Sequence, residues 1–165
     1  MAIRISRLVV PAAFAAAGFA GAWFVLPAPL GVAADTPRLI RTGRINLKDA
    51  SVHTGDWGEL RAFFNGESHG TKDVLTAVTI LKPGKAVHPA HRHAEEEYMY
   101  IVKGRGQWHL DGKDLAAEEG DMIYAAPWVM HGLINTGDAP LTFLVFKWGN
   151  KGVEAPPKPA GDDGK

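Results

Sequence analysis

Short runs of alternating residues, separated by turn residues, fill the chain from Val74 to Trp148. The first run, 74–81 (VLTAVTIL), is rich in Val, Ile and Thr and is closed by Pro83 and Gly84. β-branched residues that alternate with period two are typical of a strand with one face buried. Short strands at regular spacing with turns between them indicate an all-β barrel or sandwich. The pattern therefore predicts an all-β fold built as a single antiparallel β-barrel.

Further strands are expected along the same stretch, over 97–102, 107–110, 122–125, 129–135 and 141–148. Asp111-Gly112 and the segment 136–138 (TGD) supply turns between them. The chain shows no internal repeat, and its 165 residues suit one domain with extended ends. We therefore place one barrel at residues 73–148.

The segments on either side of the barrel differ from it in character. Residues 35–72 are expected to form an N-terminal arm with one or two strands, because 60–64 (LRAFF) is strand-like and Asn65-Gly66 signals a turn. His53 falls in a stretch of this arm that resembles a loop. Residues 149–165 are rich in proline and charge and poor in apolar residues, which predicts a disordered tail.

The N-terminus has the pattern of an export signal. Arg4 and Arg7 precede an apolar run over 8–26, and small residues lead up to Ala34. A basic start, an apolar centre and a small-x-small end are typical of a cleaved signal peptide. Residues 1–34 are therefore predicted to direct the chain out of the cytoplasm, to the periplasm or the medium.

The competing interpretation is a retained membrane anchor, since the apolar run approaches the length that spans a bilayer. Pro11, Gly18 and Gly21 interrupt that run and weaken this interpretation. Contact with a membrane is expected only through this segment if it stays uncleaved. Its removal leaves 16 basic and 18 acidic side chains, a net charge of about −2.

Charge and cysteine content narrow the possible functions. The 18 basic and 18 acidic side chains balance and form no basic stripe, so nothing favours nucleic-acid binding. The chain has no Cys, so an exported form has no disulfides and depends on its core and any bound metal for stability. No nucleophile signature and no phosphate-binding loop occur, so no catalytic residue is assigned.

Histidine and glutamate residues gather in the middle of the barrel sequence. His91 and His93 are two apart, which on a strand places both imidazoles on one face. Glu97 opens the next strand and can point toward that face. His131 lies on a distant strand and joins them only when the barrel closes. Three neutral imidazoles and one carboxylate form a ligand set suited to Fe, Mn, Co, Ni, Cu or Zn.

The spacing of these residues is more specific than their identity. From Gly84 to Gly104 the chain reads G-x6-H-x-H-x3-E-x6-G, and from Gly120 to Asn135 it reads G-x6-P-x3-H-x3-N. These two runs resemble the paired signature motifs of the cupin superfamily. The resemblance implies a small jelly-roll barrel, also described as a double-stranded β-helix. It also implies that one divalent metal ion (Fe, Mn, Ni, Cu or Zn) is held by His91, His93, Glu97 and His131.

The chain departs from the family pattern at two points. The first motif usually has five residues between its Gly and its first His, and this chain has six, between Gly84 and His91. In the second motif Pro127 is displaced by one, and Trp128 stands where a Gly is expected. These departures predict an altered turn before His131 with the ligand set intact.

Residues near the motifs receive more ordinary interpretations. His88 is expected at the rim of the site rather than as a fifth ligand. Glu95 and Glu96 are expected to be solvated neighbours of Glu97, with Glu96 as its substitute if the geometry fails. Tyr124 and Trp128 flank the second motif and could wall the mouth of the site. Asn135 is expected to have a structural role.

Four protein ligands leave about two open positions on an octahedral ion. The first hypothesis is a metal-dependent, dioxygenase-like enzyme that acts on a small organic substrate. The second is a non-redox isomerase, lyase or decarboxylase that uses the ion as a Lewis acid. The third is a non-catalytic protein that binds a small ligand or the metal itself. The fold cannot choose among these. A homodimer formed through the arm at 36–70 is also considered.

Overall fold

The computed structural model describes residues 39–161. The predicted export signal at residues 1–34 lies outside this range. Within it, no helix has the length and apolar character needed to cross a membrane.

The described part of the chain consists of β-strands and one short 3-10 helix. In chain order these are η1 (Leu47–Asp49), β1 (Ser51–Gly55), β2 (Gly58–Gly66), β3 (Thr71–Leu81), β4 (Glu96–Lys103), β5 (Gly106–Leu110), β6 (Lys113–Ala117), β7 (Met122–Ala125), β8 (His131–Ile134) and β9 (Leu141–Asn150).

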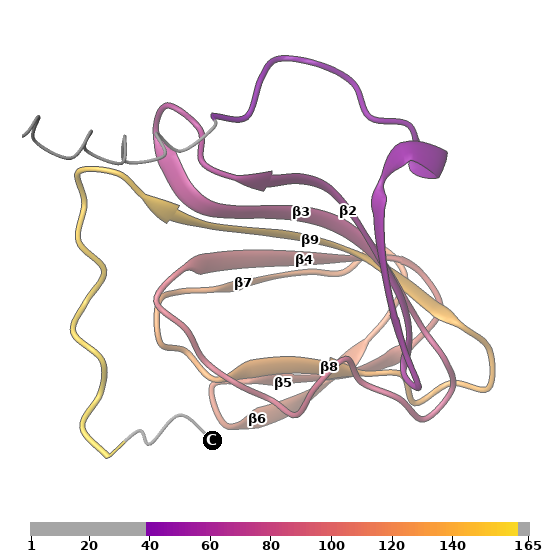
Figure 1. The fold of residues 1–165 in the computed structure, drawn as a ribbon. Coiled ribbons are helices and arrows are strands. Elements are labelled where there is room, and N and C mark those ends of the chain that lie inside the picture. The colour runs from indigo at the N-terminus through magenta and orange to yellow at the C-terminus, as the bar shows by residue number, and fades with distance from the viewer. Residues whose placement is uncertain (1–38, 162–165) are drawn as a thin grey trace, which may run out of the picture. The chain divides into compact units, whose positions relative to one another are not determined.

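The strands form two antiparallel sheets that face each other (Figure 1). The six-stranded sheet has the order β1-β2-β3-β9-β4-β7, and the three-stranded sheet has the order β6-β5-β8. Neighbours such as β3 and β9 are far apart in the sequence, so the barrel forms through long-range pairing. The predicted all-β, antiparallel jelly-roll architecture is confirmed.

Some local predictions were wrong. His53 was expected in a loop but lies on β1, which pairs with β2. Both strands fall in the arm for which one or two strands were expected. The strand β6 was also missed, because its sequence, Lys113–Ala117 (KDLAA), lacks β-branched residues. β9 continues beyond Trp148 to Asn150, because its last residues pair with the start of β3.

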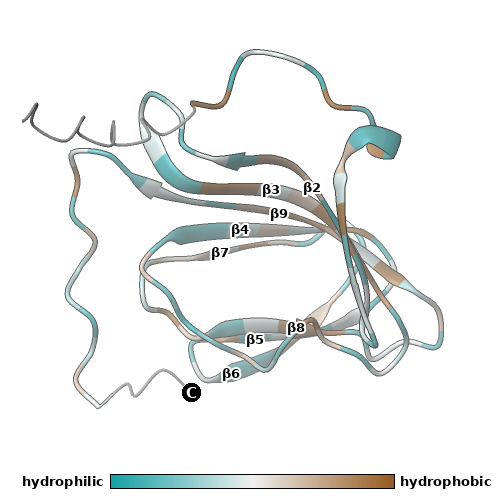
Figure 2. Cartoon of the chain, viewed as in Figure 1, coloured by the Kyte–Doolittle hydropathy of each residue, from teal (hydrophilic) through white to brown (hydrophobic). Residues whose placement is uncertain are grey.

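The core lies between the two sheets, and strand alternation selects its members. Met99 and Ile101 of β4 are buried, as the alternation predicts, and so are Phe143 and Val145 of β9. Trp108 of β5 packs into the same cluster from the opposite sheet. Figure 2 shows apolar segments along β2, β3 and β9. Burial of these side chains supplies the main favourable free energy of folding.

Asn135 joins the end of β3 to the loop between β8 and β9. Its side-chain amide donates hydrogen bonds to the carbonyl oxygens of Leu81 (3.0 Å) and Ala139 (2.9 Å). Its side-chain oxygen accepts one from the backbone N–H of Gly137 at 2.9 Å. Asn135 is fully buried. The predicted structural role for this residue agrees with these contacts.

Replacing Asn135 with Ala is expected to lower the free energy of unfolding by roughly 1–3 kcal/mol, because buried backbone groups lose their partners. Urea denaturation followed by fluorescence measures the change. Ile134→Thr is the matched control, since Ile134 is exposed on the adjacent position. Equal effects of the two substitutions would contradict this role.

Candidate metal centre

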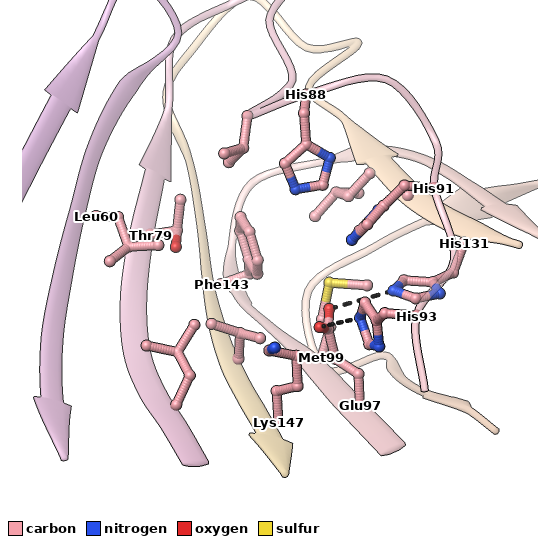
Figure 3. A pocket seen from close by; sticks show the side chains of 15 residues that line it. Leu60, Thr79, His88, His91, His93, Glu97, Met99, His131, Phe143 and Lys147 are labelled. Atoms are coloured by element: carbon pink, nitrogen blue, oxygen red, sulfur yellow. Dashed lines mark hydrogen bonds and ion pairs between the residues drawn. The ribbon is translucent and has the colours of Figure 1, made fainter. Parts of the chain in front are cut away.

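A cavity of about 450 Å3 opens between the two sheets (Figure 3). Its walls are mostly apolar, and include Leu60, Leu75, Val87, Met99, Phe143 and Val145. Four polar side chains of the lining, those of His91, His93, Glu97 and His131, gather at one end (Figure 3). A concave apolar site with a few convergent polar groups is typical of small-molecule binding.

The backbones of His91 and His131 bring two distant segments to this end of the cavity. The N–H of each residue donates to the carbonyl oxygen of the other, both at 2.9 Å. This pairing is an isolated antiparallel bridge. His91 and His93 were expected on a regular strand, but they lie on an extended segment before β4. This bridge, rather than a regular strand, therefore positions His91 beside His131.

The four side chains predicted as ligands converge on a common point in Figure 3. Ring nitrogens of His91, His93 and His131 lie within 4.8 Å of one another, so these residues could hold a metal ion. The Glu97 carboxylate lies 3.2 Å from Nε2 of His93 and 3.6 Å from Nε2 of His131. Neighbouring ligands on an ion with bonds of about 2.1 Å are separated by about 3 Å. The assignment of all four as ligands stays a prediction.

Hydrogen bonds to the outer nitrogens orient two of the imidazoles. Nδ1–H of His131 donates to the carbonyl oxygen of Val129 at 2.8 Å, and Nδ1 of His93 lies 3.1 Å from the carbonyl oxygen of Glu95. Because a carbonyl oxygen only accepts, the Val129 contact places the proton of neutral His131 on Nδ1 and leaves its Nε2 with a lone pair. Nε2 of His93 lies 3.2 Å from a carboxylate oxygen of Glu97, which also only accepts, so these contacts do not fix the tautomer of His93. Histidine ligands are usually oriented in this way.

Two buried nitrogens of the cluster, Nδ1 of His91 and Nε2 of His131, lack a hydrogen-bond partner among residues 39–161. Nε2 of His131 is buried and accepts no hydrogen bond, and His131 is only 1% exposed. Buried polar atoms nearly always have a partner, so an exception needs an explanation. A metal ion bound by Nε2 satisfies this atom and separates it from the Glu97 carboxylate. The residues present thus fit a divalent ion of the borderline class.

The pKa values favour the metal-binding forms of these side chains. Burial, followed by the neighbouring His88, His131 and His93, lowers the pKa of His91 to about 4. Burial also lowers the pKa of His131 below its usual value. Burial acts to raise the pKa of Glu97, but the hydrogen bond and charge of His93 and the charges of the other two imidazoles outweigh it, so the pKa is lowered. At neutral pH His91 and His131 are neutral and Glu97 is ionised.

Other predicted neighbours have mixed outcomes. His88 lies at the rim, with its ring 4.1 Å from that of His91 and its side chain exposed. Glu95 is not simply solvated, because its carboxylate lies 3.2 Å from Nδ1 of His93. Glu96 points elsewhere and accepts a hydrogen bond from the Tyr124 hydroxyl at 3.1 Å. Tyr124 does not line the cavity, so the prediction that it walls the mouth was wrong.

Trp128 occupies the position of the second motif at which the family pattern has a Gly. Its φ is +66°, the left-handed conformation that a Gly adopts without steric cost. The turn thus keeps the conformation expected of a Gly. Trp128 donates its backbone N–H to the carbonyl oxygen of His93 at 2.7 Å and its indole N–H to that of Pro156 at 2.6 Å. The side chain does not line the cavity, so it supports the segment that carries His93 without walling the mouth.

Two cavity residues were missed from the sequence. Lys147 of β9 has the inward parity of Phe143 and Val145, and Thr79 of β3 has that of the buried Ala77. Both could have been found from the sequence, because a lysine and a threonine stand at positions where the strand alternation predicts inward-facing side chains.

Comparison with known proteins places the chain in a family. A family model described as a cupin domain matches residues 77–147. An oxalate-binding protein from Thermotoga maritima is 31% identical over 111 residues, which cover 66% of this chain and 92% of that protein. The chain belongs to the cupin superfamily.

Two further relatives show how diverse the matches are. A gentisate 1,2-dioxygenase from Streptomyces sp. is 33% identical over 100 residues, or 56% of this chain, but the match covers only 28% of the dioxygenase. The crystal structure of a predicted oxalate decarboxylase from Thermotoga maritima has a TM-score of 0.53 and 26% identity, covering 64% of this chain and 98% of that structure. These relatives are named for different activities, so membership of the family does not determine the reaction.

Replacing His91 and His93 together with Ala is expected to abolish metal retention, because it removes two of the nitrogens that converge on the cavity. Elemental analysis of protein purified without chelator measures this. His53→Ala is the control, since His53 is exposed on β1 outside the cavity. A double variant that keeps full metal content would show that the ion binds elsewhere.

The metal-free protein is expected to lose stability as the pH falls from 6.5 to about 4. Between these pH values His91 becomes protonated in the unfolded state but stays neutral in the folded state, where its pKa is about 4. The free energy of unfolding therefore decreases as the pH is lowered. Urea titrations in chelator at several pH values measure the slope. His91→Ala should flatten it, and an unchanged slope in that variant would contradict the stated cause.

Proposed function

We propose that this chain is a metal-dependent, dioxygenase-like enzyme acting on a small organic substrate. The observation that carries the proposal is the convergence of three imidazoles and one carboxylate at the end of an apolar cavity of about 450 Å3. A cavity of this volume is suited to a small organic molecule. The partial match to a gentisate dioxygenase supports the same class.

The chain's own residues would contribute orientation and exclusion of water. The apolar walls remove water from the substrate, which strengthens every electrostatic interaction at the polar end. The contacts of Val129 and Glu95 orient the imidazoles of His131 and His93. A bound Fe or Mn ion would supply open positions for the substrate and O2.

A second candidate is metal-dependent binding of a small acid without turnover. It is favoured by the Thermotoga maritima relative named as an oxalate-binding protein, 92% of whose length is matched. The apolar walls argue against oxalate itself, because a small dianion gains nothing from contact with leucine and phenylalanine side chains. A non-redox isomerase, lyase or decarboxylase is the corresponding catalytic alternative.

We also propose that the site works outside the cytoplasm, as the sequence of residues 1–34 predicts. In that setting the chain, which contains no Cys, would gain stability from its bound metal in place of disulfides.

Protein loaded with Fe or Mn is expected to consume O2 in proportion to substrate when given a panel of phenols, including 2,5-dihydroxybenzoate, diketones and thiols. An oxygen electrode measures the rate. His93→Ala should lower it by at least about 100-fold, since loss of a metal ligand or its support costs 10- to 100-fold or more. His53→Ala should leave it unchanged.

The alternatives give different outcomes in the same assay. Turnover with Zn or Mn under anaerobic conditions would favour the non-redox enzyme. Saturable binding without O2 uptake or product would favour the binding protein. Either result would contradict the dioxygenase proposal.

A further inference from the structure

We propose that Lys147 and Thr79 select the ligand of this cavity, and that the ligand is an organic acid with its anionic group at Lys147 and a hydroxyl or carbonyl group at Thr79. This inference rests on the proposed function in one respect, that the substrate binds in this cavity. It does not require that the substrate is turned over. It names the class of substrate that the metal centre would act on.

Lys147 supplies a cation where an apolar side chain is expected. It follows Phe143 and Val145 on the inward face of β9, and it lines the same cavity as the candidate metal ligands. Its side chain is only 24% exposed. Lysine is rarely buried at all unless it is paired or binds a ligand. Lys147 is the register partner of Glu97 across the β4–β9 pairing, and both side chains line the cavity in Figure 3.

The ion pair of Lys147 with Glu95 does not use all the N–H donors of the ammonium group. Its Nζ lies 3.5 Å from a carboxylate oxygen of Glu95, and the other oxygen of Glu95 lies 3.2 Å from Nδ1 of His93. Glu95 is thus shared between the lysine and an imidazole. An ammonium group has three N–H donors, and a single long ion pair does not satisfy them. The remaining donors can bind an anion in the cavity.

The charges around this end also favour an anion. A divalent ion with the Glu97 carboxylate and neutral imidazoles carries a net charge near +1, and the Lys147–Glu95 pair adds none. A monoanion therefore neutralises this end of the cavity. A neutral ligand would leave that charge uncompensated.

Thr79 supplies a second, independent indication of a ligand. Its side chain is 0% exposed and lines the cavity, and its hydroxyl has no hydrogen-bond partner in the described part of the chain. The neighbouring Thr76 shows the usual alternative, because its hydroxyl bonds the backbone of Phe64. A buried hydroxyl without a partner is costly, so its persistence in the cavity wall indicates a group that binds there.

The two residues lie at opposite ends of an apolar wall. Thr79 pairs with Phe143 across the β3–β9 register, and Lys147 is four residues further along β9. At about 3.3 Å per residue these positions are separated by about 13 Å along the strand. The side chains of Phe143, Val145 and Leu75 line the space between them. An acid with an apolar middle and a polar far end matches this arrangement.

The test measures binding by calorimetry to the Zn-loaded protein, so that no O2 chemistry is required. The probes are 4-hydroxybenzoate, 4-hydroxyphenylacetate and 3-(4-hydroxyphenyl)propanoate, each with its amide and with the acid that lacks the hydroxyl. The protein is expected to bind at least one hydroxy acid about 10-fold or more tighter than its amide, as is usual for a hydrogen bond to a charged group.

Lys147→Met should reduce this preference for acid over amide to about 2-fold or less. Lys151→Met is the matched control, because Lys151 also pairs with a glutamate, Glu67, at 2.8 Å but does not line the cavity. A preference that survives in Lys147→Met would overturn the role of Lys147, since the carboxylate would then be bound by the ion alone.

Thr79→Val should remove the preference for the hydroxy acid over the acid without hydroxyl, while leaving the preference for acid over amide in place. Because it removes an unpaired buried hydroxyl, it should also leave the midpoint of urea unfolding equal or higher. Thr142→Val is the control on the outward face of β9. A hydroxyl preference that persists in Thr79→Val would overturn the role of Thr79.

The outcomes separate this inference from the proposed enzyme function. Selective binding without O2 uptake by the Fe-loaded protein would support the ligand class and contradict the dioxygenase. O2 uptake with neutral thiols or diketones, unaffected by Lys147→Met, would support the enzyme and overturn the ligand class. Absence of saturable binding for every acid of the panel would overturn the ligand class as well.

Discussion

The reciprocal backbone pairing of His91 with His131 is the contact on which the site depends. It joins the segment before β4 to the first residue of β8, and so links a loop of the first motif to the three-stranded sheet. Two hydrogen bonds of 2.9 Å fix the separation of the two backbones, and the imidazoles then have little freedom. Gly132 lies against Ala90 at this crossing, where an added Cβ would approach the Ala90 backbone to 3.0 Å. The close approach of the two segments therefore requires a small residue as well as hydrogen bonds.

The same arrangement creates an electrostatic problem that a cation resolves. Burial keeps His91 and His131 neutral, while Glu97 stays ionised beside them. Nε2 of His131 has no hydrogen-bond partner within residues 39–161, and a carboxylate oxygen of Glu97 lies 3.6 Å away. Two lone pairs directed at one space repel each other unless a positive charge lies between them. The cluster thus costs stability in the metal-free protein and is pre-organised for an ion.

Much of the barrel core and of the candidate metal site could be predicted from the sequence, because two kinds of local pattern determine them. Alternation identified the inward residues of β4 and β9, such as Met99 and Val145, and the motif spacing brought together the residues that converge in the cavity. The support of Trp128 could not be predicted, because its left-handed backbone and its bond to Pro156 depend on contacts between distant segments. Glu95 was misjudged for the same reason, since its partner Lys147 is adjacent only after β9 pairs with β4. Residues that act through long-range pairing carry little signal of their own in a single sequence.

The central claim is that His91, His93, Glu97 and His131 together hold one divalent ion at the end of an apolar cavity. X-ray absorption spectroscopy of the Zn- or Fe-loaded protein measures its coordination directly. The account predicts a first shell of nitrogen and oxygen at about 2.0–2.2 Å, with outer-shell scattering from three imidazole rings that falls to two in His131→Ala. Scattering from fewer than three rings in the unchanged protein, or the same number in the variant, would contradict it.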